Sequence, residues 1–339
     1  MKIARLQESS GAVTMAVRHD NGSFTKAEGS LEAGFKDTGT AVNGKLLAPV
    51  DPRITLCIGL TLAMVVGIRR PSWRHAAVVG ALAGLGVVTK LTFAGLVPAA
   101  VLAVVVIALR LRRAEGSGAA VRSLLAGGCA LCVPIVLYVI WATAQGRPFV
   151  PVGASTPTLP ANEIPPSSLR EHLSYAWQLY LPRMPWQTDF FGFSPITETW
   201  IGGWLGRYGW LDYGANSWMR AVGTWLMWIL GALAVSGLAQ HRTTLKRSLP
   251  EIACFVLLAL GLAATIALVG YDYKRTTGYV FEQVRYLFPL LGLYAAAVTA
   301  ASLGLGRRLA PSLSVTIVVV LSLHGLSGLA LTVARYYAS

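Results

Sequence analysis

The sequence predicts an all-α protein: a polytopic bundle of about eight membrane-spanning helices with one long, aromatic-rich loop outside the membrane. Three observations predict it. Hydrophobic residues make up 54% of the chain, apolar runs alternate with polar gaps from residue 54 onward, and every second gap is rich in Arg and Lys. A spanning helix needs about 20 apolar residues to cross a core about 30 Å thick. The candidate spans are residues 54–68, 76–89, 91–109, 123–143, 220–239, 251–270, 286–304 and 311–334.

The distribution of charge predicts the orientation. The basic gaps hold 12 Arg and Lys residues against one acid, Glu115, whereas residues 144–219 hold four basic and five acidic residues. The 12 residues are Arg69, Arg70, Arg74, Arg110, Arg112, Arg113, Arg122, Arg242, Lys246, Arg247, Arg307 and Arg308. Short cytoplasmic loops keep Lys and Arg. We therefore expect a multi-pass protein of the plasma membrane with segments 144–219 and 271–285 outside the cytoplasm.

The formal net charge of +14 would suggest nucleic-acid binding in a soluble protein. Part of that charge is explained by loop placement, and no basic stretch interleaved with aromatic residues resembles a nucleic-acid groove. Anionic lipid headgroups are the expected partners instead. The four cysteines lie inside apolar runs, which favours ordinary packing over a metal or redox site. No metal site is predicted from the residues, and the oligomeric state stays open.

Residues 76–109 form one apolar stretch that is too long for a single ordinary span. Both flanking gaps are basic, so the stretch must cross the membrane and return, with Lys90 near the outer turn. The small-residue run from Gly80 to Gly86 favours close helix packing. An ionisable group such as Lys90 inside an apolar stretch is typical of a functional site. The alternative is a lysine that only extends to the interface.

The outer segment 144–219 holds six of the ten tryptophans. Ser167 and Ser168 followed by Glu171 predict the start of a helix over about 169–180. Its apolar face would hold Leu169, Leu173, Ala176, Trp177 and Tyr180. Such a helix is expected to lie in the membrane interface. Pro182 and Pro185 would follow its end.

Two further clusters are candidates for binding. Arg285 and Tyr286 open the seventh span, where Arg285 can fork onto a phosphate or anchor at the interface beside Tyr286. Arg207 and Asp212 belong to an aromatic run that can contact substrate or pack as an interfacial turn around an ion pair.

The chain divides into four parts: residues 1–50, helices one to four over 51–143, the outer loop 144–219 and helices five to eight over 220–339. The first 50 residues are polar and contain no Trp or Tyr. The orientation places them outside. We interpret them as the remnant of a first outer loop in an N-terminally incomplete chain, with a disordered tail as the alternative.

Three places in the chain resemble the GT-C glycosyltransferases of the bacterial protein O-mannosyltransferase-like group. They are the glycine-rich run ending in Thr89-Lys90, the element Arg285-Tyr286-Leu287-Phe288-Pro289, and the Trp- and Gly-rich segment 186–218. The resemblance covers about residues 50–335. Asp51 is similar in position to an acid that often precedes the first span in that group.

The resemblance implies transfer of a sugar from a polyprenyl-phosphate donor to an acceptor hydroxyl at the outer face. Lys90 and Arg285 would then hold the leaving phosphate, with Tyr286, Arg207 and Asp212 also contacting substrate. Asp51 would be the candidate catalytic residue. The sequence departs from the family because no acidic loop follows a first spanning helix, so the base is otherwise unassigned and an inactive chain is one outcome. The resemblance leaves the use of a divalent metal open.

Two other functions are compatible with the same pattern. A transporter or flippase would also be polytopic, although such proteins tend to show internal repeats and helices broken at the midplane. A membrane assembly protein without catalytic activity would resemble an incomplete transferase. The sugar and the acceptor are not indicated by the residues.

Overall fold

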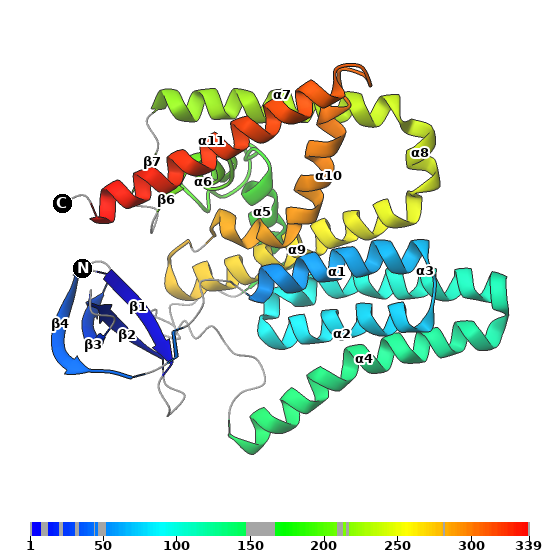
Figure 1. Ribbon diagram of the computed structural model, residues 1–339, viewed down its shortest axis with the longest axis horizontal. Helices are drawn as coiled ribbons and strands as arrows, with labels where there is room; N and C mark the ends of the chain where they lie inside the picture. Colours follow the sequence, from blue (N-terminus) through cyan, green and yellow to red (C-terminus); the bar gives the residue numbers. More distant parts are fainter. Residues whose placement is uncertain are drawn as a thin grey trace. The chain divides into compact units, whose positions relative to one another are not determined.

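A computed structural model describes residues 2–7, 13–19, 23–30, 34–43, 45–46, 52–146, 167–208, 213–214, 217–280 and 282–337 of the chain (Figure 1). The chain separates into two compact units. One comprises Met1–Asp51 with Val333–Ser339, and the other comprises Pro52–Thr332. Each unit is described by itself.

The N-terminal unit contains an antiparallel sheet, with strand order β4-β3-β2-β1-β5. The strands are β1 Lys2–Gln7, β2 Val13–Arg18, β3 Phe24–Ser30, β4 Gly34–Ala41 and β5 Lys45–Leu46. Buried Ala16 and Val42 pack with Phe24 on it. This sheet differs from the disordered tail that was one alternative here, and it makes the all-α prediction incomplete. The interpretation of the segment as the remnant of an outer loop stays a prediction. Strands β3 and β4 carry one large apolar residue each, Phe24 and Phe35, so two-residue alternation is weak in that part of the sequence.

The second unit is a helical assembly. Its helices are α1 Pro52–Arg69, α2 Trp73–Thr89, η1 Leu91–Leu96, α3 Val97–Glu115, α4 Ser117–Ala144, α5 Leu169–Tyr180, η2 Ile196–Ile201, α6 Gly202–Gly206, α7 Ser217–Gln240, α8 Arg242–Arg247, α9 Leu249–Thr277, η3 Val284–Leu290, α10 Leu291–Ser302 and α11 Ala310–Tyr337. Each of the eight predicted apolar segments is helical. A short pair of strands, β6 Arg207–Tyr208 and β7 Tyr213–Gly214, follows α6.

Five helices are long and apolar enough to cross a membrane, within the part of the chain that the structure describes. They are Thr92–Glu115, Ser117–Ala144, Arg220–Gln240, Leu249–Thr277 and Ala310–Ser327. Three further apolar helices are shorter: Thr55–Arg69, Trp73–Thr89 and Tyr286–Ser302. The chain is therefore a helical integral membrane protein. Eight crossings remain a prediction, because these three helices are shorter than the about 20 residues needed to span a bilayer.

Helices α2 and α4 lie side by side at very short backbone separation. A Cβ added at Gly80 would lie 2.1 Å from the carbonyl oxygen of Gly127, and one at Gly84 would lie 2.3 Å from that of Leu131. A similar approach joins η1 to α9, where a Cβ at Gly261 would lie 1.8 Å from the carbonyl oxygen of Gly95. Small residues allow such contact between apolar helices. The predicted close packing of the Gly80–Gly86 run is confirmed.

The basic gaps are joined by contacts between helix ends. Arg69 Nε lies 3.4 Å from the Glu251 carboxylate, and the Arg110 guanidinium donates to the carbonyl of Ile68. Gln240 Nε2 donates to the carbonyl of Gly304 at 2.9 Å, just before the last basic pair. We call residues 68–74, 110–122, 240–251 and 304–308 the basic end. Helices α2 and α9 both start there and run to an opposite end rich in aromatic side chains.

Candidate functional site

Lys90 and Tyr286 meet at the end of α2 away from the basic end. The Lys90 ammonium lies 4.6 Å from the centre of the Tyr286 ring. Lys90 is the C-cap of α2: its backbone N–H donates to Gly86, and its extended backbone turns the chain into η1. A cation this close to an aromatic face is attracted by the ring quadrupole. The contact joins two of the predicted site residues that lie far apart in the sequence.

The other predicted site residues are placed only in part. Arg285 lies in η3, directly before Tyr286, and Arg207 lies in β6, where it pairs with Gly214. The side chains of both arginines lie outside the described residues, as do Asp51 and Asp212. The predicted Arg207–Asp212 pair and the catalytic role of Asp51 therefore stay predictions.

Helix α5 spans Leu169–Tyr180, the predicted range. Ser168 is its N-cap, and its hydroxyl accepts the Glu171 backbone N–H at 3.2 Å, as the capping signal predicts. The side chains of Leu169 and Leu173 are exposed, 76% and 63% respectively. They are thus available to an interface, as expected. Two other members of the predicted face, Ala176 and Tyr180, instead pack against the buried core, and the Tyr180 hydroxyl donates to the carbonyl of Ala263, so the predicted face is only partly confirmed.

The sequence analysis did not identify the inward face of α5. Tyr175, Gln178 and Leu179 are buried there against the bundle. Gln178 donates to the carbonyl of Thr188 at 2.8 Å and accepts the N–H of Phe190 at 3.3 Å. Because Gln178 is polar, the inward face of α5 does not appear as an apolar stripe in the sequence. Its hydrogen bonds nevertheless hold the loop after α5 against the helix.

Buried Glu282 is a second feature that the sequence analysis missed. It is 5% exposed, and the Tyr175 hydroxyl donates a hydrogen bond to its carboxylate. Gly270 makes the space for this contact, because a Cβ there would lie 2.0 Å from Glu282 Oε1. Burial and the nearby Glu282 charge raise the pKa of Tyr175. The only sequence signal was an acid beside the Arg285-Tyr286 element.

Tyr271 ties the same region to the start of α5. Its hydroxyl donates to Glu171 Oε2 at 2.8 Å, and its ring lies 4.2 Å from that of His172. The hydrogen bonds from Tyr271 and Ser168 lower the pKa of Glu171 because both favour the ionised carboxylate. We call this region, with Lys90, α5, Tyr271 and residues 282–286, the aromatic end.

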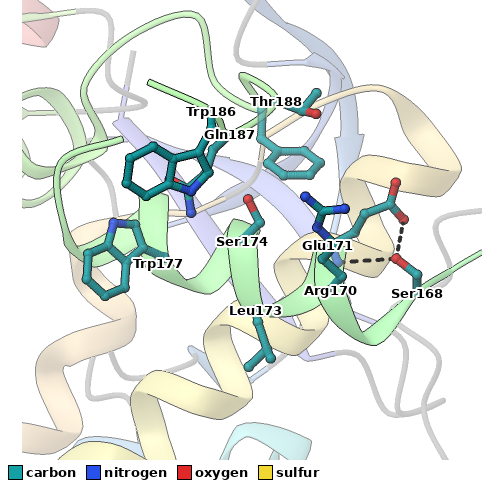
Figure 2. A pocket seen from close by; sticks show the side chains of 10 residues that line it. Ser168, Arg170, Glu171, Leu173, Ser174, Trp177, Trp186, Gln187 and Thr188 are labelled. Atoms are coloured by element: carbon teal, nitrogen blue, oxygen red, sulfur yellow. Dashed lines mark hydrogen bonds between the residues drawn. The ribbon is translucent and has the colours of Figure 1, made fainter. Parts of the chain in front are cut away.

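A pocket of about 570 Å³ opens along α5 (Figure 2). It is lined by Ser168, Arg170, Glu171, Leu173, Ser174, Trp177, Trp186, Gln187, Thr188 and Phe190. Figure 2 shows the indole rings of Trp177 and Trp186 on one side of it and Arg170 with Glu171 on the other. Trp186 is 75% exposed, so its ring is available to a ligand. Flat aromatic faces beside hydroxyl, amide and charged groups suit a ligand that is apolar on one side and polar at its edge.

The pocket and the Lys90 contact are connected through packed side chains. Phe190 lines the pocket and lies 5.5 Å from Tyr175, ring centre to ring centre. Tyr175 donates to Glu282, which lies two residues before η3. Tyr286 of η3 in turn lies beneath Lys90. The aromatic end therefore combines a cation, a buried carboxylate and an open pocket.

Tyr175→Phe is expected to destabilise the protein by about 1–3 kcal/mol, because Glu282 stays buried while it loses a hydrogen-bond donor. Thermal unfolding of the purified protein in detergent measures the effect. Tyr279→Phe is the matched control, since Tyr279 is 69% exposed. Equal unfolding midpoints for the two variants would show that the Tyr175–Glu282 bond contributes nothing to folding.

Among the described residues, no three His, Cys, Asp or Glu side chains gather closely enough to hold a metal ion. Comparison of the chain with family models, curated proteins and solved structures finds no match. The geometry of the aromatic end is therefore the guide to function.

Proposed function

We propose that the chain is a GT-C-like membrane glycosyltransferase that moves a sugar from a polyprenyl-phosphate donor to an acceptor. In this proposal the aromatic end faces the outside of the plasma membrane, and segments 144–219 and 271–285 lie on the same side. The observation that carries it is the 4.6 Å distance between the Lys90 ammonium and the Tyr286 ring. This contact supports the proposal because it brings the Thr-Lys end of the glycine-rich helix to the Arg-Tyr-Leu-Phe-Pro element.

Lys90 suits a phosphate ligand for a physical reason. The Tyr286 ring holds the ammonium at the end of α2. A lysine ammonium is a compact positive charge of the kind that binds phosphate. Arg285 adjoins Tyr286 in the sequence, and a guanidinium can donate two parallel hydrogen bonds to phosphate oxygens. Two preorganised cations would stabilise the negative charge that develops on the leaving phosphate.

The proposed transfer is a single displacement. The acceptor hydroxyl oxygen bonds to the anomeric carbon as the bond from that carbon to the phosphate oxygen breaks. The bonding electrons leave with polyprenyl phosphate, whose charge Lys90 and Arg285 neutralise. The hydroxyl proton passes to a carboxylate acting as general base. Asp51 and Glu282 are the two candidates, and Glu282 lies two residues before η3.

The pocket on α5 offers space for the acceptor. Its volume of about 570 Å³ lies within the range of small-molecule sites, roughly 300–1,000 Å³. The exposed Trp186 ring can stack against a sugar or another flat apolar group, while Ser174 and Gln187 can bond its polar edge. The contacts from Phe190 through Tyr175 to Glu282 support this assignment, because they link the lining of the pocket to one candidate base.

A reconstituted transfer assay tests the proposal. The purified chain is placed in liposomes with a polyprenyl-phosphate hexose labelled in the sugar, and glycan and peptide acceptors are supplied. We expect label in the acceptor and release of polyprenyl phosphate. Movement of the intact labelled lipid between leaflets without transfer would assign a flippase instead. If neither transfer of the label nor movement of the lipid is detected, both activities are excluded and a structural role remains.

A further inference from the structure

The Trp73 ring contacts two guanidinium groups at the basic end. The Arg122 Cζ atom lies 4.4 Å from the centre of the Trp73 ring, and the Arg74 Cζ atom lies 5.6 Å from it. Trp73 begins α2, whereas Arg122 belongs to the second turn of α4. The ring thus holds two cations from different helices near each other.

Trp73 and Arg122 line a pocket of about 310 Å³, and Arg74 follows Trp73 in the chain without lining it. It is lined by Ser72, Trp73, Leu111, Glu115, Gly118, Ala119 and Arg122. Arg112 and Arg113 are exposed in the last turn of α3, close in the sequence to Leu111 and Glu115 of the pocket. A guanidinium that stacks on an aromatic ring keeps its N–H groups in the plane of the guanidinium, where they can bond a phosphate. The pocket therefore has the groups that bind an anion, and Glu115 adds an acceptor for a hydroxyl group.

The position of the pocket points to a lipid. It lies where two candidate membrane spans, Thr92–Glu115 and Ser117–Ala144, share an end. Below Arg122, the same face of α4 continues at helical spacing with Leu125 and Val133. These two side chains are 62% and 52% exposed. A polar pocket with an uncovered apolar stripe running from it matches a headgroup with an acyl chain.

We infer that this pocket is a binding site for an anionic phospholipid. Arg122 binds its phosphate from the pocket wall, and Arg74 adds positive charge beside Trp73. Trp73 lies at the level of the glycerol, and one acyl chain follows α4 past Leu125. Tryptophan is enriched at that depth, and basic side chains at the membrane surface attract anionic lipids. The site is at the opposite end of α2 from Lys90, so it is independent of the proposed sugar transfer.

Native mass spectrometry of the whole detergent-purified protein tests the inference. Phosphatidylglycerol, phosphatidylcholine and inorganic phosphate are titrated separately. We expect the variant Arg74→Gln with Arg122→Gln to bind phosphatidylglycerol roughly tenfold more weakly than wild type, because the phosphate contact of Arg122 and the nearby charge of Arg74 are both lost. The matched control, Arg242→Gln with Arg308→Gln, removes the same charge from other basic gaps and should change binding less than about threefold.

The competing outcomes are distinct. Equal weakening in the two double variants would indicate a general charge effect and overturn the site. Phosphatidylcholine that binds as tightly as phosphatidylglycerol would also overturn it. Inorganic phosphate that displaces the lipid at equal concentration would assign a soluble phosphate ligand rather than a lipid. Thermal unfolding of each variant establishes that it is folded. Leu125→Asn, which keeps both arginines, should also weaken lipid binding because it places a polar group on the path of the acyl chain.

Discussion

Gly84→Ala is expected to lower the unfolding midpoint and the yield of folded protein in membranes. The added Cβ would lie 2.3 Å from the carbonyl oxygen of Leu131, a backbone atom of α4 that cannot move without shifting its helix. Forcing extra volume into a close-packed contact costs about 1–3 kcal/mol, and more where backbone must shift. Thermal unfolding in detergent, with size-exclusion yield, measures the loss.

Gly128→Ala is the matched control. Gly128 lies on α4 next to the crossing, and a Cβ there would meet no atom within 4 Å. Since alanine is about 1 kcal/mol better than glycine inside a helix, this variant should be neutral or slightly more stable. Gly84→Ala is thus expected to lower the unfolding midpoint, whereas Gly128→Ala should leave it unchanged or raise it slightly. A Gly84→Ala protein as stable as Gly128→Ala would mean that α2 and α4 do not meet as described.

Lys90→Ala is expected to lower sugar transfer about 100-fold in the reconstituted assay, because it removes one of two cations from the leaving phosphate. Lys90→Arg should keep activity within about tenfold of wild type, since it keeps the positive charge but replaces a compact ammonium with a planar guanidinium. Tyr286→Leu should have an intermediate effect because it removes the ring on which the ammonium rests.

Lys246→Ala provides the control for charge. Lys246 is exposed in the last turn of α8 at the basic end, away from the proposed site. It should leave transfer unchanged. Full activity in Lys90→Ala, measured beside an active wild type, would remove Lys90 from phosphate binding. Loss of activity in Lys246→Ala to the same extent would show that net charge, rather than position, controls transfer.

Elements with a strong local signal were predictable from the sequence. The apolar runs became helices because each keeps apolar side chains over several helical turns. Ser168 with Glu171 determined the start of α5 without help from distant residues. The glycine run in α2 predicted close packing, since only small side chains allow two backbones to approach so nearly. Lys90 was identified because an ionisable group is rare in such a run.

Features that depend on distant partners were not predictable. Glu282 is notable only because Tyr175 donates to it and Gly270 leaves room for it, and neither contact is visible in the order of residues. Gln178 is polar, yet it is buried because its amide bonds the backbone of Thr188 and Phe190. The N-terminal strands stabilise one another by pairing, and single strands of mixed composition carry little signal.

Cysteine cross-linking tests most directly whether Lys90 and η3 form one site. In a background with Cys57, Cys129, Cys132 and Cys254 replaced, Lys90→Cys is paired with Tyr286→Cys and treated with a short bismaleimide in native membranes. The pair of Lys90→Cys with Arg242→Cys, which joins the aromatic end to the basic end, is the control. We expect a cross-link between positions 90 and 286 and none between 90 and 242. A cross-link only in the control pair would contradict a shared site for Lys90 and Tyr286, and with it the phosphate pocket.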